Sequence, residues 1–236
     1  MLLYIIRHGI PDYSTDTLTP HGKLQAEAVA KRLSVHGIDE IYSSPLGRAK
    51  QTAEPTSLLL NREIKIIPEF SEDIAFWKFN ATTAKGTNDW AFHCNLEKML
   101  GSDEMCQSCD SFSHGFYLDD NAAKKAYEEL SIASDKFIES LGYKRRGEGN
   151  AYDGIAPNDK RIALFCHQGV GLHLISRILN IPPHIFTATF DLSFSSVTVI
   201  RFTNSEKVYP KCLCLSDLSH IYGDRLPYKY HNNLDI

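Results

Sequence analysis

Four side chains suited to holding an anion each follow a short apolar stretch of the sequence. They are Arg7, His8, Arg48 and His167. Arginine offers a planar fork of donors that matches the oxygens of a phosphate group, and it keeps its charge in any site. Two arginines can therefore hold an oxyanion and steady a phosphoryl group in transfer, while one imidazole is left to attack phosphorus. These residue types predict phosphoryl chemistry.

The two histidines can hold different roles in such a site. Neighbouring cations lower the pKa of an imidazole and keep it neutral, as a nucleophile must be, whereas a bound phosphate dianion raises the pKa of a second imidazole beside it. Taken alone, a histidine or an arginine at the end of a strand is more often a packing or surface residue. The convergence of four such residues on one sheet edge is what indicates a site.

The elements that must position these residues alternate along the chain. Apolar runs typical of buried strands lie at residues 2–6, 40–42, 64–67, 161–166, 196–202 and 208–215. Helices with an apolar stripe are expected at residues 20–34, 46–60, 122–141 and 170–179. This alternation predicts a three-layer α/β/α sandwich with a mainly parallel sheet. Ligands of such sheets bind beyond the carboxyl ends of the strands, where all four residues are expected.

We expect one domain over residues 1–236, since this length suffices for a single sizeable core. Between residues 73 and 120 the alternation is lost, and the segment is rich in aromatic residues, Gly, Asn and Ser. We interpret residues 73–120 as a cap inserted into the domain. Residues 147–159 have the composition of turns and are expected to form an exposed loop.

Composition and charge exclude several classes of partner. The formal net charge is −4 and the isoelectric point is about 6.2, so no global basic field would attract nucleic acid or an anionic membrane. The sequence shows no basic leader before its first apolar run and no apolar run long enough to span a bilayer. Its six cysteines are scattered, which suits a reducing compartment. We expect a cytoplasmic protein that binds anions only locally.

Cysteines supply the one candidate for a metal site. Cys106 and Cys109 have a C-x-x-C spacing, and with Cys94 and either His93 or His114 they could supply four zinc ligands. The second half of such a set lacks the usual tight spacing, which favours free thiols. The sequence shows no P-loop and no carboxylate cluster for magnesium. We expect no metal and no cofactor, with the cysteine site left as an alternative.

Four motifs, in order, resemble the histidine phosphatase family, which includes the cofactor-dependent phosphoglycerate mutases. They read Ile5-Ile6-Arg7-His8-Gly9, Leu18-Thr19-Pro20-His21-Gly22-Lys23-Leu24-Gln25-Ala26, Ser43-Ser44-Pro45-Leu46-Gly47-Arg48-Ala49-Lys50-Gln51-Thr52-Ala53 and Phe165-Cys166-His167-Gln168-Gly169-Val170. The resemblance covers residues 2–72 and 161–180 well and the middle of the chain hardly at all. It implies a phosphoglycerate mutase-like fold and the activity of a phosphoric monoester hydrolase.

The resemblance also implies a role for each residue of the phosphate pocket. His8 is the nucleophile that becomes a phosphohistidine, and Arg7, Arg48 and His167 surround the phosphate, with His167 also taking part in catalysis. The backbone N–H of Gln168 is a further phosphate ligand.

The general acid of this family is a glutamate in an L-x-E pattern after the strand that follows the Arg48 helix. Phe70-Ser71-Glu72 fits this pattern best, and Glu69 fits it less well. A proton donor is needed because an alkoxide is a poor leaving group, and a phosphate dianion nearby raises the pKa of a carboxyl so that it is protonated. We therefore assign the acid to Glu72.

The sequence departs from the family pattern R-H-G-x-T-x-x-N at two positions. Pro11 stands in place of the threonine and Ser14 in place of the asparagine. Pro11 removes a backbone donor, and the Ser14 hydroxyl is shorter than an asparagine side chain. Ser14 is still a candidate phosphate-binding residue, with secondary contacts that differ from those of the family.

Residues 73–120 bear on whether the reaction is hydrolysis or mutase transfer. A mutase must hold a second acidic group of its substrate, yet the segment contains three lysines, no arginine and eight acidic residues. It carries eight aromatic residues instead: Phe76, Trp77, Phe79, Trp90, Phe92, Phe112, Phe116 and Tyr117. They either wall a pocket for a partly apolar leaving group or form the core of the cap. Lys144-Arg145-Arg146 is either a second anion site or an ordinary basic helix end.

We therefore predict a histidine phosphatase that hydrolyses a small organic phosphate monoester, without a metal, through a phosphohistidine. Phosphoglycerate mutase or sugar bisphosphatase activity is an alternative, which converging cations in the cap would favour. A phosphate-binding or protein-interaction module with weak catalysis is an alternative of another class, which a pocket blocked by Pro11 or by the cap would favour. The substrate and the oligomeric state are left open.

Overall fold

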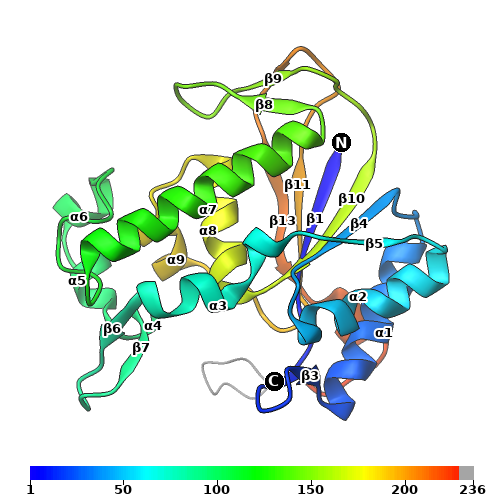
Figure 1. Cartoon of the computed structure of the whole chain (residues 1–236), viewed down its shortest axis with the longest axis horizontal. Helices are drawn as coiled ribbons and strands as arrows, with labels where there is room; N and C mark the ends of the chain where they lie inside the picture. Colours follow the sequence, from blue (N-terminus) through cyan, green and yellow to red (C-terminus); the bar gives the residue numbers. More distant parts are fainter. Residues whose placement is uncertain (229–236) are drawn as a thin grey trace.

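Figure 1 shows the computed structural model of the chain, which describes residues 1–228 except the side chains of residues 74–76. Residues 229–236 of the predicted domain lie outside the described residues. A six-stranded sheet in the order β13-β11-β1-β10-β4-β5 forms the centre. Its strands are β1 (Leu2–Arg7), β4 (Glu40–Ser43), β5 (Ile64–Ile66), β10 (Arg161–Cys166), β11 (Val197–Arg201) and β13 (Lys211–Asp217). All six overlap stretches that the sequence pattern predicts as strands.

The sheet is mixed and mainly parallel, as predicted. β1, β10, β4 and β5 run parallel to one another, whereas β11 is antiparallel to both β1 and β13. The chain enters β11 at the edge where β1 ends, because the Arg7 N–H donates to Ser196 O at 3.2 Å and the Ser195 N–H donates to His8 O at 3.0 Å. The segment just before β11 is thereby held against Arg7 and His8.

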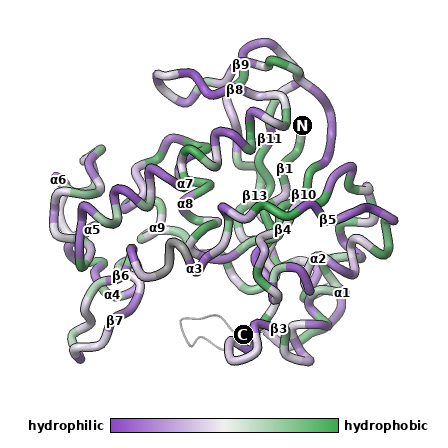
Figure 2. The backbone as a smooth tube through the Cα atoms, in the orientation of Figure 1, coloured by the Kyte–Doolittle hydropathy of each residue, from purple (hydrophilic) through white to green (hydrophobic). Residues whose placement is uncertain are grey.

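Alternate residues of the central strands face two different apolar layers. Leu3 and Ile5 of β1 belong to one buried cluster, and Ile6 belongs to the other. This alternation explains why the strands read as continuous apolar runs, since both faces of the sheet are covered. Figure 2 shows the same feature as hydrophobic colour along the central strands.

Helices on both faces complete the three layers (Figure 1). They are α1 (Pro20–Ser34), α2 (Gly47–Leu60), α7 (Asp120–Ser140), α8 (Gln168–Leu179), α9 (Pro183–Thr189) and α10 (Ser219–Gly223). Val29 and Leu33 of α1 pack in the cluster on one face, and Leu130 and Phe137 of α7 pack in the cluster on the other. Within residues 1–228, no helix has the length and apolar composition needed to cross a membrane.

The segment between β5 and α7 consists of short elements, which agrees with its loss of regular alternation. It holds η1 (Pro68–Phe70), α3 (Glu72–Ala75), η2 (Phe76–Lys78), β6 (Asn80–Thr82), β7 (Asn88–Trp90), α4 (Ala91–Cys94), α5 (Leu96–Leu100) and α6 (Asp103–Gln107). Its buried apolar residues, such as Phe79 and Phe116, belong to the same cluster as α7 and α8. The division into a domain and a cap at residues 73–120 stays a prediction.

The prediction of an exposed loop over residues 147–159 is wrong in part. β9 (Tyr152–Gly154) lies within it and pairs with β8 (Tyr143–Arg145) and with β12 (Lys207–Val208) in a small antiparallel sheet. The Tyr152 ring is fully buried and meets Phe202 at a centroid distance of 5.4 Å. The residues around Tyr152 are typical of turns, so the sequence did not reveal that the Tyr152 ring packs against a distant residue.

Candidate active site

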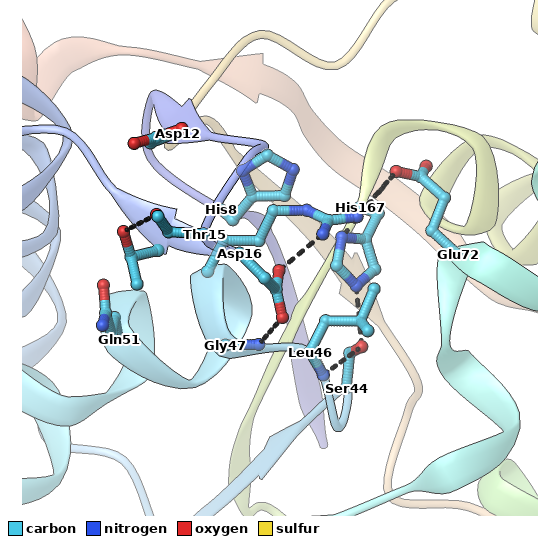
Figure 3. Close-up of polar contacts among 12 residues, drawn as sticks. His8, Asp12, Thr15, Asp16, Ser44, Leu46, Gly47, Gln51, Glu72 and His167 are labelled. Carbon is cyan, nitrogen blue, oxygen red and sulfur yellow. Dashed lines mark hydrogen bonds and ion pairs between the residues drawn. The ribbon is translucent and has the colours of Figure 1, made fainter.

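The structure brings five of the predicted residues together at the carboxyl edge of the sheet: Arg7, His8, Arg48, Glu72 and His167. Figure 3 labels three of them, His8, Glu72 and His167. Arg7 and Cys166 are paired in the register of β1 and β10, so the next residues, His8 and His167, leave the sheet side by side. Their ring centroids are 5.2 Å apart. A side-chain nitrogen of each histidine and a Glu72 carboxylate oxygen all lie within 4.8 Å of one another.

The His8 ring is fixed in the orientation that a nucleophile needs. Its Nδ1 lies 2.8 Å from Gly9 O, and since a carbonyl oxygen can only accept, Nδ1 carries the proton. Nε2 therefore has the lone pair, and it is buried with no hydrogen-bond partner in the protein. Burial lowers the pKa of His8 well below its usual 6.5, and His167, Arg7 and Arg48 lower it further. The imidazole is therefore neutral and can attack.

His167 is fully buried between Ser44 and Glu72. Its Nε2 lies 2.7 Å from Ser44 Oγ, and its Nδ1 lies 3.8 Å from Glu72 Oε2 without a hydrogen-bond partner. Burial, then Arg48 and Arg7, lower the pKa of His167 well below 6.5. The sequence argument expected a charged imidazole beside a phosphate dianion. In the anion-free protein His167 is neutral, so the expected charge requires bound phosphate.

The two arginines are buried, and each keeps a nitrogen without a partner in the protein. Arg7 Nη1 donates to Leu192 O at 2.5 Å, and its guanidinium carbon lies 3.9 Å from the centroid of the Phe194 ring. Arg48 Nη1 donates to Asp16 at 2.6 Å, and Nη2 lies 3.5 Å from Glu72. The Nε atoms of both arginines are buried and make no hydrogen bond within the protein. Other buried polar atoms of the chain also lack a partner, but these two belong to cations that line one cavity, where an anion could accept from them.

Glu72 begins α3 and is almost fully buried. Its Oε1 accepts from the Gly169 N–H at 2.9 Å. Burial raises the pKa of the Glu72 carboxyl, while that N–H and the guanidinium groups of Arg7 and Arg48 oppose the rise. A carboxyl with a raised pKa can be protonated where an ordinary glutamate would not be, as a proton donor requires.

Asp16 is a residue of the site that the sequence analysis missed. Its Oδ2 accepts from the Gly47 N–H at 2.5 Å, and its Oδ1 pairs with Arg48. The backbone of Asp16 also lies close to α2, since a Cβ added at Gly47 would meet Asp16 O at 2.2 Å. A carboxylate suits the positive end of a helix, and here it orients the first arginine of that helix. No sequence motif distinguishes Asp16 from the other polar residues of its turn.

Two predicted phosphate ligands have other contacts as well. Gln168 is the first residue of α8 and lines the cavity described next, and its side-chain amide donates to Asp191; the role of its backbone N–H in phosphate binding stays a prediction. Ser14 is exposed, and both its N–H and its hydroxyl donate to Asp12 Oδ1. The structure does not bring Ser14 to the cavity described next.

A cavity of about 420 Å³ opens beside these residues. Of the predicted site, Arg7, Arg48, Glu72 and Gln168 line it; its other walls are Tyr13, Asp73, Trp77 and Trp90. Among the described residues, Pro11 does not line the cavity, and the segment after β5 contributes walls to it without filling it. The blocked pocket that would favour a binding module is therefore not seen.

The aromatic residues of the segment 73–120 divide into two groups. Trp77 and Trp90 line the cavity, while Phe79, Phe92, Phe116 and Tyr117 are buried in the apolar core, with Phe112 packed against them. The Phe76 side chain lies outside the described residues. Trp90 also belongs to the buried core, so packing accounts for most of these residues. That the two indoles contact a partly apolar leaving group stays a prediction.

Neither candidate for a metal site has the features of one. Within residues 1–228, His8, Glu72 and His167 form the only cluster of His, Cys, Asp and Glu side chains tight enough to hold an ion. Arg7 and Arg48 lie beside it, and their charges favour an anion over a cation. All six cysteines are free thiols. The absence of a metal stays a prediction.

Comparisons with known proteins add evidence independent of this geometry. Residues 3–93 match the family described as the histidine phosphatase superfamily, branch 1. A probable phosphoglycerate mutase of Serratia proteamaculans is 38% identical over 61 residues, which make up 22% of this chain and 28% of that protein. The chain thus matches less than a third of the length of that curated relative.

Solved structures share the fold over nearly the whole chain. The phosphoserine phosphatase of Entamoeba histolytica, in complex with 3-phosphoglyceric acid, has a TM-score of 0.60 and 22% identity, covering 93% of this chain and 98% of that one. The mycobacterial glucosyl-3-phosphoglycerate phosphatase has a TM-score of 0.57 and 17% identity over 92% and 99%. The α-ribazole phosphatase of Shigella flexneri has a TM-score of 0.56 and 20% identity over 92% and 96%.

The matched family region contains Arg7, His8, Arg48 and Glu72, and the fold places His167 beside them. Residues 3–93 thus match branch 1 of the histidine phosphatase superfamily, as the predicted resemblance implies, and the whole chain has the fold of solved histidine phosphatases.

Proposed function

We propose that the protein is a metal-independent phosphomonoesterase that hydrolyses a small organic phosphate monoester through a phosphohistidine at His8. One observation carries this proposal. Four buried nitrogen atoms of the site have no hydrogen-bond partner in the protein: Arg7 Nε, His8 Nε2, Arg48 Nε and His167 Nδ1. Leaving buried polar groups unpaired costs free energy. The oxygens of a phosphoryl group can accept hydrogen bonds from the two arginines and His167, and its phosphorus is the electrophile for His8 Nε2.

The first step follows from the positions of these groups. His8 Nε2 attacks phosphorus, and the bond from phosphorus to the ester oxygen breaks as the P–N bond forms. Arg7, Arg48 and protonated His167 hold the oxygens of the phosphoryl group as charge moves across them. Glu72 donates its proton to the departing oxygen, which leaves as an alcohol.

The second step returns the enzyme to its starting state. The ionised Glu72 takes a proton from water, and the water oxygen attacks phosphorus as the P–N bond breaks. The electron pair returns to His8 Nε2, orthophosphate leaves, and Glu72 is protonated again. The same carboxyl thus acts as acid and then as base, for which its raised pKa suits it.

The relatives support hydrolysis, and the cavity weighs against the mutase alternative. The solved structures compared above are named as phosphatases of small phosphate esters, whereas the curated relative is named as a probable mutase. Among the described residues that line the cavity, Arg7 and Arg48 are the only cations. A second phosphate or carboxylate of a substrate would therefore find no further cation there.

The test is phosphate release from 4-nitrophenyl phosphate in EDTA by the wild type and by His8→Ala. We expect EDTA-resistant hydrolysis in the wild type, its loss in His8→Ala, and a phosphoprotein in quenched wild type that survives alkali and is lost in acid. His173→Asn is the matched control, since His173 is also fully buried, with Nδ1 on a glycine carbonyl and Nε2 without a partner, but its ring stacks on Phe79 in the apolar core. Equal activity in wild type and His8→Ala would overturn the proposal.

A further inference from the structure

The cavity has a buried end and an exposed mouth with different chemistry. Arg7, Arg48 and Glu72 form the buried end, with exposures of 2%, 6% and 7%. Tyr13 and Trp77 form the mouth, with exposures of 63% and 69%. A phosphoryl group at His8 occupies the buried end, so the organic part of the ester extends toward the mouth.

Among the described residues, the walls around the mouth offer a carboxylate and aromatic rings. Asp73 is exposed and lines the cavity one residue after the proposed acid. Trp77 and Trp90 present aromatic rings, whose faces are electron-rich, while the Tyr13 ring already has the Arg48 guanidinium carbon 5.4 Å from its centroid. Among the described lining residues, both cations belong to the buried end, where Arg7 donates to Leu192 O and Arg48 contacts Asp16 and Glu72.

One of these walls is fixed in place before any ligand binds. The Trp90 indole lies so close to α8 that a Cβ added at Gly169 would meet its ring at 2.5 Å. The indole also stacks on Phe92 at a centroid distance of 5.0 Å. A ring held in this way loses little freedom when a ligand packs against it. Trp90 is therefore a rigid surface at the inner side of the mouth.

We infer that the substrate is a phosphate monoester whose alcohol carries an ammonium or trimethylammonium group, held at the mouth between aromatic rings and Asp73. This inference rests on the proposed phosphomonoesterase and specifies its substrate class. Aromatic rings with a nearby carboxylate bind such cations by electrostatic attraction to the ring faces. A leaving group with its own carboxylate or phosphate meets Asp73 and is disfavoured.

Two matched pairs of substrates test the inference. Phosphocholine and 3,3-dimethylbutyl phosphate have the same shape, but only phosphocholine has the positive charge. We expect kcat/KM for phosphocholine to be about tenfold higher, as cation–π contacts of moderate burial provide, with the difference mainly in KM. Phosphoethanolamine and phosphoserine differ by one carboxylate, and we expect phosphoethanolamine to be the better substrate.

Two variants and a control locate the effect at the mouth. In Trp77→Leu and in Asp73→Asn the preference for phosphocholine over its neutral analogue should fall to about threefold or less. Asp103→Asn makes the same change of charge at an exposed position of α6, outside the lining of the cavity, and should keep the full preference.

The outcomes separate this inference from the proposed function. If 4-nitrophenyl phosphate is hydrolysed through His8 but the neutral analogue is used as well as phosphocholine, the inference is wrong and the phosphomonoesterase stands. A preference for phosphoserine over phosphoethanolamine would also overturn the inference, because it would show that a carboxylate is recognised. If no phosphohistidine forms and no ester is hydrolysed, the proposed function fails, and the inference fails with it.

Discussion

Basic residues lie at both ends of the central sheet, and they differ in burial and in the partners that the protein gives them. At the carboxyl end, Arg7 and Arg48 are buried and each has a nitrogen without a partner in the protein. At the amino end, β8 carries Arg145, between Lys144 and Arg146 (Figure 1). The N-terminal amine lies 3.4 Å from the Tyr143 hydroxyl, which places β8 beside the start of β1.

The difference lies in what the protein itself supplies to each cation. Arg145 donates to the Tyr152 hydroxyl, to Arg177 O and to Asn180. Arg146 pairs with Asp153, and Lys144 with Glu139 at 3.2 Å. These side chains also remain in contact with water, so a further anion would gain little from them. The interpretation of Lys144-Arg145-Arg146 as a second anion site is therefore not supported.

The largest effect is expected when the guanidinium group of Arg48 is replaced. In Arg48→Lys the charge stays, but one ammonium cannot reproduce the fork that contacts Asp16 and Glu72 and still donate to phosphate. We expect kcat/KM for an alkyl phosphate to fall roughly 10³-fold, as for the loss of a donor aimed at the reacting oxygens.

Arg177→Lys is the matched control for that variant. Arg177 also contacts an aspartate with two nitrogens, Nε at 3.2 Å and Nη2 at 2.5 Å from Asp135. It lies near the far end of α8, about 15 Å along the helix from His167. Its replacement should change kcat/KM by less than about twofold. Equal losses of kcat/KM in the two variants would show that the effect comes from disturbing any arginine–aspartate pair. It would then say nothing of a special role for Arg48 at the site.

Glu72→Gln should lower kcat/KM about 10²-fold with an alkyl phosphate, near the lower limit for loss of a general acid. The amide keeps an acceptor for the Gly169 N–H but has no proton to give. The loss should be much smaller with 4-nitrophenyl phosphate, whose leaving group needs no proton. A similar loss with both esters would assign Glu72 to binding instead of proton transfer.

The pH profile gives a second measurement of the same residue. Because the pKa of Glu72 is raised, its protonated form persists above pH 4.5, and kcat/KM falls only as pH rises through the raised value. Because the pKa of His8 is lowered, the neutral nucleophile persists below pH 6.5, which sets the acidic limb. Glu72→Gln should lose the alkaline limb and keep the acidic one.

Asp16→Asn should lower kcat about tenfold, because Arg48 loses the charge that orients its guanidinium plane. Asparagine tolerates the left-handed backbone of residue 16, where φ is 51°, so the turn should keep its shape. Asp12→Asn in the same turn is the control, since Asp12 contacts Ser14 and not Arg48. A fall in KM without a fall in kcat would show that Asp16 only repels the substrate.

The residues that the sequence located correctly share a simple physical basis. Arg7 and His167 adjoin apolar runs, and the carboxyl ends of parallel strands must meet at one edge, whatever the loops do. The register of β1 and β10 then places His8 beside His167 without help from any distant residue. This part of the site depends on strand order alone, and it could therefore be predicted.

The residues that were missed or displaced depend on how loops fold back. Asp16 reaches Arg48 only through a left-handed turn and a close approach to Gly47. Ser14 turns to Asp12 instead of the cavity. Tyr152 lies in the short strand β9, and its ring packs against Phe202. No local sequence pattern reveals that contact. Composition gives the character of such segments but not their tertiary contacts.

The smallest effect on activity is expected at the amino end of the sheet. Arg145→Ala removes hydrogen bonds to three groups and should lower the free energy of unfolding by about 1–2 kcal/mol. Arg146→Ala breaks a more exposed pair with Asp153 and should lower the free energy of unfolding by less than about 0.5 kcal/mol.

Both variants remove one positive charge, and both should keep kcat/KM within about twofold of the wild type. Thermal unfolding and steady-state kinetics on phosphocholine and on a sugar bisphosphate measure both quantities. A selective loss with the bisphosphate would show that this end contacts a second phosphate, because a residue with a purely structural role would affect both substrates alike.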